Sequence, residues 1–309
     1  MKLYILSDIH YDFYLKSYHG NMDRFFEQRF LPADTIVIAG DIANTIADME
    51  LFLKEISKRY KNVVLCLGNH DLTITWENGA FKTSEEKIEA LQKLCDSFQN
   101  VHMLEGRTVT IDGVKFGGCM GMWDYSFLYY DECAESQMNY IWKHNWFDGV
   151  HWNYCNQNIK EIRAVQFEKM RNVLDEKPDV MLTHFSPLRN NMPAHYKTNE
   201  YSTYFYFDNK IADDYLAENS KRIWCSGHVH DAYKDGQILI HPNAYPNEHA
   251  RVFNKLHRKD FLVEVQMIEL NLENIENLFV TSGKAISLLM ELLENPPEPN
   301  DALKRLFKN

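Results

Sequence analysis

The sequence of 309 residues lacks the patterns that identify several specialised classes of protein. Its six cysteines are scattered and include no C-x-x-C pair, which argues against a structural zinc site built from cysteines. Several of them stand in apolar, strand-like runs, which favours buried, reduced thiols in a reducing compartment. The sequence has no internal repeat and no low-complexity tract, so we expect a globular fold of one large domain or two ordinary ones.

Long apolar runs and an excess of positive charge are also missing. No stretch approaches the ~20 apolar residues that span a bilayer, and the N-terminal MKLYIL is too short to be the apolar part of a signal peptide. We therefore expect a cytoplasmic protein without a membrane partner. Lysine and arginine number 33 against 44 aspartates and glutamates. The resulting net charge of −11 disfavours a general affinity for nucleic-acid backbones.

The sequence is rich in short apolar runs that alternate with helical patterns. The runs LYIL, TIVIA, VVLCL, DVMLT, RIWCS and QILIH are predicted to be buried strands. Apolar residues at helical spacing predict helices from about 46 to 60, after Thr83, and over roughly 159 to 175. TVTIDGVKFGG predicts a strand pair that turns at Asp112-Gly113. This alternation predicts an α/β fold in which helices cover the faces of a sheet.

Two segments differ from this pattern. Residues 120–158 are crowded with aromatic side chains, and we interpret them as an insertion that packs over a main domain spanning residues 1–270. The aromatic residues form either a small satellite core, which we favour, or a wall that stacks a ring of a substrate. Residues 271–309 are predicted to be a C-terminal helical extension that contains the stiff spacer NPPEPN.

Polar side chains gather at the carboxyl ends of the predicted strands. LYIL is followed by Asp8 and His10, TIVIA by Asp41, VVLCL by Asn69, His70 and Asp71, DVML by His184, and RIWCS by His228 and His230. In open α/β sheets, ligands bind outside the carboxyl ends of the strands. We therefore expect five strand ends to converge on one site. In extended chain, the two members of each D-x-H or H-x-H pair would point to the same side.

Imidazole, carboxylate and amide groups together are typical ligands of divalent Mn, Fe, Zn, Co or Ni. Seven candidate ligands are too many for one tetrahedral ion and suit two ions. Two ions that share a bridging carboxylate can clamp the attacking and leaving oxygens of a phosphoryl displacement. Taken alone, GNHD could be a turn, because Gly and Asn tolerate positive φ. Within the ordered set we keep the turn only as the reason for Gly68.

The order D-x-H, GD, GNHD, a single His and GH-x-H resembles the calcineurin-like metallophosphoesterase superfamily, in its phosphodiesterase branch, over roughly residues 1–250. The resemblance implies a four-layer αββα sandwich of two mixed sheets flanked by helices, with a two-metal centre at the strand ends. It also implies a hydrolase that cleaves phosphodiester, or alternatively phosphomonoester, bonds by attack of a metal-bridging hydroxide. No side chain forms a covalent intermediate in that mechanism.

The resemblance also implies a role for each residue. One ion would be held by Asp8, His10, Asp41 and His230, and a second by the bridging Asp41 together with Asn69, His184 and His228. His70 would contact the phosphate and protonate the leaving oxygen, and Asp71 would orient the His70 ring. Asn69 and His70 would line the substrate site. Trp123, Asp124 and Tyr245 are further candidates for residues near the substrate.

Two other functions share parts of this pattern. A nuclease of the double-strand-break-repair type has the same motif order, but it would need a DNA-binding face, which the acidic composition disfavours. A catalytically inactive interaction scaffold usually loses His70 or metal ligands, and this chain keeps them all. The motifs leave the substrate, the native metal and the oligomeric state open. A small molecule or nucleotide is expected as substrate rather than a protein.

Overall fold

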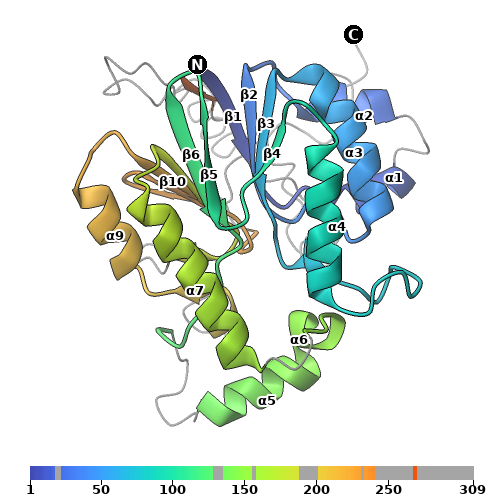
Figure 1. Cartoon of the computed structure of the whole chain (residues 1–309), viewed down its shortest axis with the longest axis vertical. Coiled ribbons are helices and arrows are strands. Elements are labelled where there is room, and N and C mark those ends of the chain that lie inside the picture. The colour runs from blue at the N-terminus through green and yellow to red at the C-terminus, as the bar shows by residue number, and fades with distance from the viewer. Residues whose placement is uncertain are drawn as a thin grey trace, which may run out of the picture.

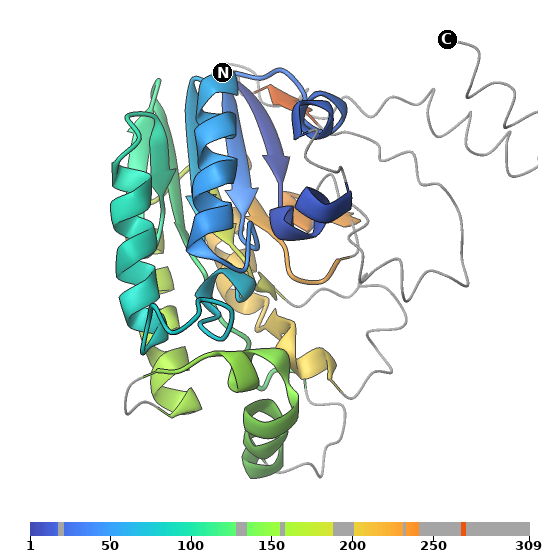
Figure 2. The ribbon, with the colours of Figure 1, turned by 90° about the vertical axis from the view of Figure 1, so that its right-hand side faces the viewer.

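The computed structural model describes residues 1–17, 22–127, 135–154, 158–187, 201–230, 233–240 and 267–269. Two large mixed sheets stand side by side, and helices flank them (Figures 1 and 2). The predicted α/β fold, an αββα sandwich of two mixed sheets, is confirmed.

The first sheet carries the three N-terminal strands of the site. Its order is β13 (Met267–Glu269), β1 (Lys2–Leu6), β2 (Thr35–Ala39), β3 (Asn62–Cys66) and β4 (Val101–Met103). Strands β1 to β4 run parallel and β13 runs antiparallel to β1. Because the strands are parallel, the ends of β1, β2 and β3 lie at the same edge of the sheet. These three strands correspond to the predicted runs LYIL, TIVIA and VVLCL.

The second sheet carries the other two strands of the site. Its order is β11 (Tyr233–Asp235), β12 (Ile238–Ile240), β10 (Ile223–Ser226), β7 (Val180–Thr183), β6 (Val114–Cys119) and β5 (Arg107–Ile111). The four inner strands are parallel, and each edge strand is antiparallel to its neighbour. The predicted hairpin forms β5 and β6, and Asp112 and Gly113 at its turn both have positive φ. A small two-stranded sheet joins β8 (Ser186–Pro187) to β9 (Tyr206–Phe207).

Helices flank both sheets. The side of the first sheet carries α1 (Tyr11–Ser17), α2 (Met22–Arg29), α3 (Ile46–Arg59) and α4 (Ser84–Asp96), and the side of the second carries α7 (Ile159–Asp175) and α9 (Lys210–Ala217). Two further helices, α5 (Glu135–Asn145) and α6 (Phe147–His151), lie beyond the end of the sandwich opposite the N-terminus (Figure 1). Short 3-10 turns cover His70–Leu72 (η1) and Ser202–Tyr204 (η2).

The three predicted helices each begin at a residue whose side chain caps the first turn. The side chain of Thr45 accepts a hydrogen bond from the Asp48 amide at the start of α3, and Thr83 accepts one from the Glu86 amide at the start of α4. Helix α7 spans the predicted range 159–175 and starts with a full capping box. Helices α1, α2, α5, α6 and α9 were not predicted.

Burial on both faces explains why the strands of the first sheet have continuous apolar sequences. On β1, Leu3 and Ile5 pack between the two sheets, whereas Tyr4 and Leu6 pack on the other side of the strand in the larger apolar cluster. Both faces of the strand are therefore buried, which favours continuous apolar sequence over alternation.

Several further sequence predictions can be compared with the structure. Four cysteines, Cys66, Cys95, Cys119 and Cys225, are buried and free of disulfides, as predicted. Within the described part of the chain, no helix combines the length and the apolar character needed to cross a membrane. Tyr245, Cys133, Cys155 and the extension 271–309 lie outside the described residues, so the domain division stays a prediction.

Truncation of the core between the sheets should destabilise the protein. Phe116 on β6 is fully buried there. We expect Phe116→Ala to lower the free energy of unfolding by about 3–5 kcal/mol, because it removes the apolar contacts and leaves a cavity. Leu51→Ala on α3 is the control, since Leu51 is 48% exposed and should change stability by less than about 0.5 kcal/mol. Chemical denaturation of both variants measures this, and equal stability losses would contradict the assigned core.

Candidate metal centre

The structure brings the predicted ligands together in two groups. Asp8, His10, Asp41 and His230 form the first group, with one ligand atom of each residue within 4.8 Å of the others. Asp41, His184 and His228 form the second group in the same way, so that Asp41 belongs to both.

Asn69 adds an amide oxygen to the second group. Its Oδ1 lies 2.8 Å from Nε2 of His184 and 2.9 Å from Nδ1 of His228. The two groups thus have the composition that the sequence resemblance implied for two ions with a shared carboxylate.

The backbone at five of these residues is left-handed, contrary to the expectation of extended chain. The φ angles are 52° at Asp8, 45° at His10, 55° at Asp41, 71° at His228 and 54° at His230. Positive φ is uncommon outside glycine and costs free energy, which surrounding contacts must offset. Three hydrogen bonds supply such contacts: Asp8 N to Gly40 O (2.9 Å), His10 N to Asp41 O (3.0 Å) and His228 N to Asp8 Oδ1 (3.0 Å).

Gly68 serves a different purpose from the predicted turn. Its φ is not positive. A Cβ at this position would overlap the amide nitrogen and the carboxylate of Asp41. Glycine is therefore required because the loops after β2 and β3 approach each other closely. The chain does turn at Asn69, but the positive φ expected for that turn is not the reason for Gly68.

Backbone carbonyls set the orientation of two imidazole rings. His184 Nδ1 lies 2.9 Å from Ala39 O, and His228 Nε2 lies 3.1 Å from Tyr204 O. Each of these nitrogens carries the hydrogen that the carbonyl accepts. The other ring nitrogen of each histidine then faces the second group with its lone pair.

Buried polar atoms without partners indicate what the first group is suited to hold. Both ring nitrogens of His10 are buried and have no hydrogen-bond partner among the described residues. Oδ2 of Asp41 is also buried, with ion-pair contacts to Nε2 of His184 at 3.3 Å and to Nε2 of His10 at 3.7 Å. Such atoms are costly in a folded protein. A divalent cation in contact with them would satisfy them, and the mixture of imidazole and carboxylate matches Mn, Fe, Zn, Co or Ni. The residues present therefore fit divalent metal ions.

The protonation states agree with metal ligation at most of these residues. Burial lowers the pKa of His10 to about 4 and the pKa of His228 to about 3, which keeps both rings neutral. Burial alone would raise the pKa of Asp41, but the neighbouring histidines, His184 above all, outweigh it and lower that pKa. Burial also lowers the pKa of His184, but Asp41 beside it raises this pKa to about 9. A bound cation would have to displace that proton.

His70 lies beside the first group, and its ring partner is Asn44. The centroids of the His70 and His10 rings are 4.7 Å apart. His70 Nδ1 is 2.8 Å from Asn44 Oδ1, and Asn44 Nδ2 donates to Asp12 Oδ2 at 2.7 Å. The prediction that Asp71 orients the ring is wrong. Asp12 is part of this chain of contacts.

Asp71 instead clamps two loops together. Its buried carboxylate accepts hydrogen bonds from the amides of Asp41 (3.0 Å), Ile42 (2.9 Å), Ala43 (3.0 Å) and Gly68 (2.8 Å). Four amide donors offset the cost of burying a carboxylate. Asp71 therefore fixes the loop that carries Asp41 rather than the ring of His70.

A buried lysine forms a hydrogen bond with the backbone of Asn44. Lys87 on α4 is fully buried, and its Nζ donates to Asn44 O (2.7 Å) and Thr73 O (2.7 Å) and pairs with Glu77 Oε1 (2.9 Å). Neither Lys87 nor Asn44 was identified in the sequence. The one sequence signal for Asn44 is its position three residues after Asp41.

The aromatic insertion (residues 120–158) contacts the site through Asp148. Asp148 on α6 was not predicted, yet its Oδ1 accepts a hydrogen bond from Asn69 Nδ2 at 2.7 Å. Burial raises the pKa of Asp148 to about 7, whereas its bond to Asn69 lowers it. Trp142 and Trp152 are almost completely buried, in agreement with a satellite core.

The residues predicted to lie near the substrate are Trp123, Asp124 and Tyr245, and the structure describes the first two. Trp123 is fully buried and packs edge-on against Tyr125 and Tyr204, so it offers no surface on which a substrate could stack. Asp124 accepts hydrogen bonds from the amides of Ser126 and Asp208. Tyr245 lies outside the described residues, and its role stays a prediction.

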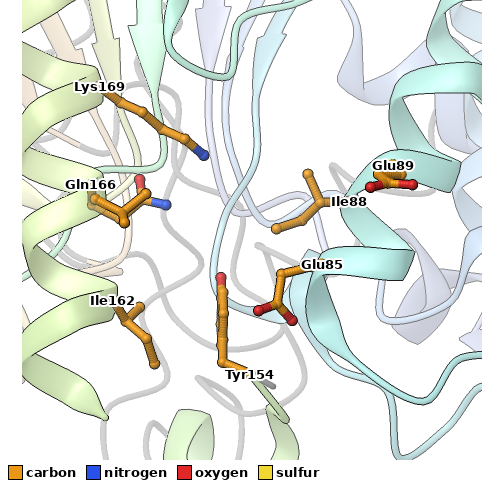
Figure 3. A pocket seen from close by; sticks show the side chains of 8 residues that line it. Glu85, Ile88, Glu89, Tyr154, Ile162, Gln166 and Lys169 are labelled. Atoms are coloured by element: carbon orange, nitrogen blue, oxygen red, sulfur yellow. The ribbon is translucent and has the colours of Figure 1, made fainter. Parts of the chain in front are cut away.

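A cavity of about 200 Å³ lies away from the ligand groups, between α4 and α7 (Figure 3). Glu85 and Ile88 approach it from α4, Gln166 and Lys169 from α7, and Tyr154 from between them. Buried oxygens of Glu85, Gln166 and Tyr154 have no partner among the described residues. A polar cavity of this size is suited to ordered water.

Comparison with known proteins agrees with this site. A model of the calcineurin-like phosphoesterase family matches residues 1–232, so the chain belongs to that family. Family membership and the two ligand groups make it a metal-dependent phosphoesterase, a hydrolase of phosphate esters. No curated protein matches the sequence.

Two solved structures are similar. The crystal structure of phosphopantetheinyl hydrolase (PptH) from Mycobacterium tuberculosis has 20% sequence identity and a TM-score of 0.61, over 81% of this chain and 92% of that one. The structure of a protein of unknown function, AQ665 from Aquifex aeolicus, has 13% identity and a TM-score of 0.29, over 69% of this chain and 92% of that one. The first of these supports the fold described above.

The close approach at Gly68 generates a test of the site. We expect Gly68→Ala to reduce metal binding at both groups, because the new Cβ would push the Asp41 carboxylate that they share. Gly79→Ala is the matched control: Gly79 has a φ of +79°, but its Cβ would meet no described atom within 4 Å. It should lose stability through backbone strain and keep its metal. Elemental analysis after Mn²⁺ loading measures the metal content of both variants. Full metal content in Gly68→Ala would contradict the predicted overlap.

Proposed function

We propose that the protein hydrolyses phosphodiesters of small molecules or nucleotides at a centre of two divalent ions. The main observation that supports this proposal is the pair of ligand groups that share Asp41, with the ring of His70 next to the first group. A shared carboxylate is the arrangement by which two ions are held close enough to act on one phosphate. Phosphomonoesters remain the alternative substrate class, because both classes use the same chemistry at such a centre.

The ligand groups define what each ion would contact. Asp8, His10, Asp41 and His230 would hold one ion, and Asp41, Asn69, His184 and His228 the other. Bound there, the ions supply an activated water and neutralise negative charge on the phosphate oxygens. Mn, Fe, Zn, Co and Ni all suit these donors, and manganese is our first choice for testing.

The chain itself supplies the proton for the leaving oxygen. The Nδ1 hydrogen of His70 is held by Asn44 Oδ1, so Nε2 is the nitrogen left for the substrate. Burial lowers the pKa of His70 well below its ordinary value, and Asp41 raises it in part. An anionic phosphate beside the ring would favour its protonated form. Asp12 accepts from the Asn44 amide and thereby keeps its oxygen turned toward the ring.

The proposed substrate class and location follow from charge and cysteine chemistry. The net charge of −11 disfavours extended contacts with a nucleic-acid backbone. We therefore place small phosphate esters and nucleotides ahead of DNA. Cys66, Cys95, Cys119 and Cys225 are buried and free of disulfides, which supports a reducing compartment such as the cytoplasm.

The activity and the role of His70 can be tested with one series of substrates. The protein loaded with Mn²⁺ should hydrolyse bis-p-nitrophenyl phosphate, and Asp41→Ala should abolish the reaction because it removes the shared ligand. His70→Ala should reduce kcat by about 10²–10⁴-fold for esters with alkyl leaving groups, which need a proton. The loss should be smaller for p-nitrophenyl esters, whose leaving group is stable as an anion. Equal losses for both kinds of ester would remove the role assigned to His70.

A second variant tests how His70 is held. Asn44→Ala should lower kcat for alkyl esters by about tenfold, the value of one hydrogen bond to the ring, while the metal content stays that of the wild type. The measurement pairs steady-state kinetics with elemental analysis. Lost metal with unchanged kcat per bound ion would show that Asn44 supports the ligands instead.

A further inference from the structure

Helix α6 and the residue that follows it contact both Asn69 and His70. Asp148 Oδ1 on α6 accepts a hydrogen bond from Asn69 Nδ2 at 2.7 Å, and Trp152 Nε1 donates to Asn69 O at 2.8 Å. The Phe147 ring stacks on the His70 ring, with centroids 4.1 Å apart and planes at 24°. The segment beyond the end of the sandwich (Figure 1) therefore fixes a metal ligand and the proton donor at once.

The contact with Asp148 decides which way the Asn69 amide faces. An amide has one accepting oxygen and one donating NH₂ group, whereas a carboxylate only accepts. Because Nδ2 is bound to Asp148, Oδ1 faces His184 Nε2 (2.8 Å) and His228 Nδ1 (2.9 Å). The reversed amide would place oxygen against the carboxylate and NH₂ against the nitrogens that face the cation.

The carboxylate of Asp148 is itself held in place. Asp148 is fully buried, and Trp146 Nε1 donates to its other oxygen, Oδ2, at 3.3 Å. The backbone carbonyl of Asp148 is bonded as well, since it accepts a hydrogen bond from Trp152 N at 2.8 Å. The side chain therefore cannot turn to solvent without leaving the Asn69 amide unpaired in the interior.

We propose that Asp148 is a positioning residue for metal binding: it locks the Asn69 amide with Oδ1 toward the cation site formed with Asp41, His184 and His228. The inference rests on the proposed function in taking this group as a cation site. It also gives the aromatic insertion a part in the metal centre, because occupancy of the second site then depends on how α6 is packed.

Metal affinity at the two sites separates this role from simple packing. Apo protein is titrated with Mn²⁺, and free Mn²⁺ is followed by electron paramagnetic resonance. Asp148→Leu removes the acceptor at similar volume, and we expect it to keep the first site and to bind the second ion about 10–100-fold more weakly. Val150→Ala is the control, because Val150 lies on the same helix α6 and is 49% exposed. It should stay within about threefold of the wild type.

A swap of the two side chains tests the pair directly. In Asn69→Asp the two carboxylates repel, and in Asp148→Asn the bond to Asn69 loses its charge. In the double variant N69D/D148N the new amide donates to the carboxylate at 69, and its oxygen can take the indole N–H of Trp146. Each single variant loses second-site affinity by some factor, and without coupling the double variant would lose the product of the two factors. We expect the loss in the double variant to be smaller than that product by at least about tenfold, a coupling typical of contacting residues.

The outcomes separate this inference from the proposed function. Unchanged Mn²⁺ binding in Asp148→Leu, equal weakening of both sites, or no recovery in the swap would each overturn the role of Asp148. Near-ultraviolet circular dichroism checks folding, and if Asp148→Leu does not fold, the isosteric Asp148→Asn and the swap decide. Wild-type protein that binds two ions and hydrolyses no ester would contradict the proposed function while leaving the Asp148 result standing. Wild-type protein that binds no Mn²⁺ would overturn both.

Discussion

The close approach of the loops after β2 and β3 is the constraint on which the rest of the site depends. Asp71 holds it by accepting four backbone amides, three from the loop of Asp41 and one from Gly68. In return, the amide of His70 donates to Asp41 Oδ1 at 2.8 Å. The shared ligand is thus fixed by backbone contacts on both sides, which leaves its other oxygen, Oδ2, for the cation groups.

The second requirement is that two separate sheets meet at their carboxyl ends. The ligands Asp8, Asp41 and Asn69 come from the first sheet, whereas His184 and His228 come from the second. Hydrogen bonds cross between them, from the His228 amide to Asp8 and from His184 to the carbonyl of Ala39. The apolar core between the sheets therefore does more than stabilise the fold, because it sets the distance between the two halves of the metal centre.

The helices beyond the sandwich complete this arrangement from a third direction. Asn44 and Asp148 each bind one residue of GNHD, the first from the start of α3 and the second from α6. Chemistry that requires fixed ligands is served well by such contacts, since the partners of a ligand determine its orientation and basicity. The strand ends thus supply the two ligand groups and His70, and residues at the surrounding helices orient Asn69 and His70.

The sequence determined the strands, the long helices and the order of polar residues at the strand ends, because these depend on local patterns. A run such as VVLCL followed by GNHD marks a buried strand and its exposed end without reference to any other segment. The ligand groups could be anticipated for the same reason, since parallel strands bring their ends together.

Only the tertiary structure decided which polar groups meet. Asp71 bonds amides 28 to 30 residues away in the neighbouring loop, and Asn69 meets Asp148 across 79 residues. No periodicity encodes such pairs, so Asp71 was assigned to the wrong partner, while Asn44 and Asp148 were missed. The need for glycine at position 68 also arises from crowding between loops. That crowding exists only once β2 and β3 have paired in the first sheet.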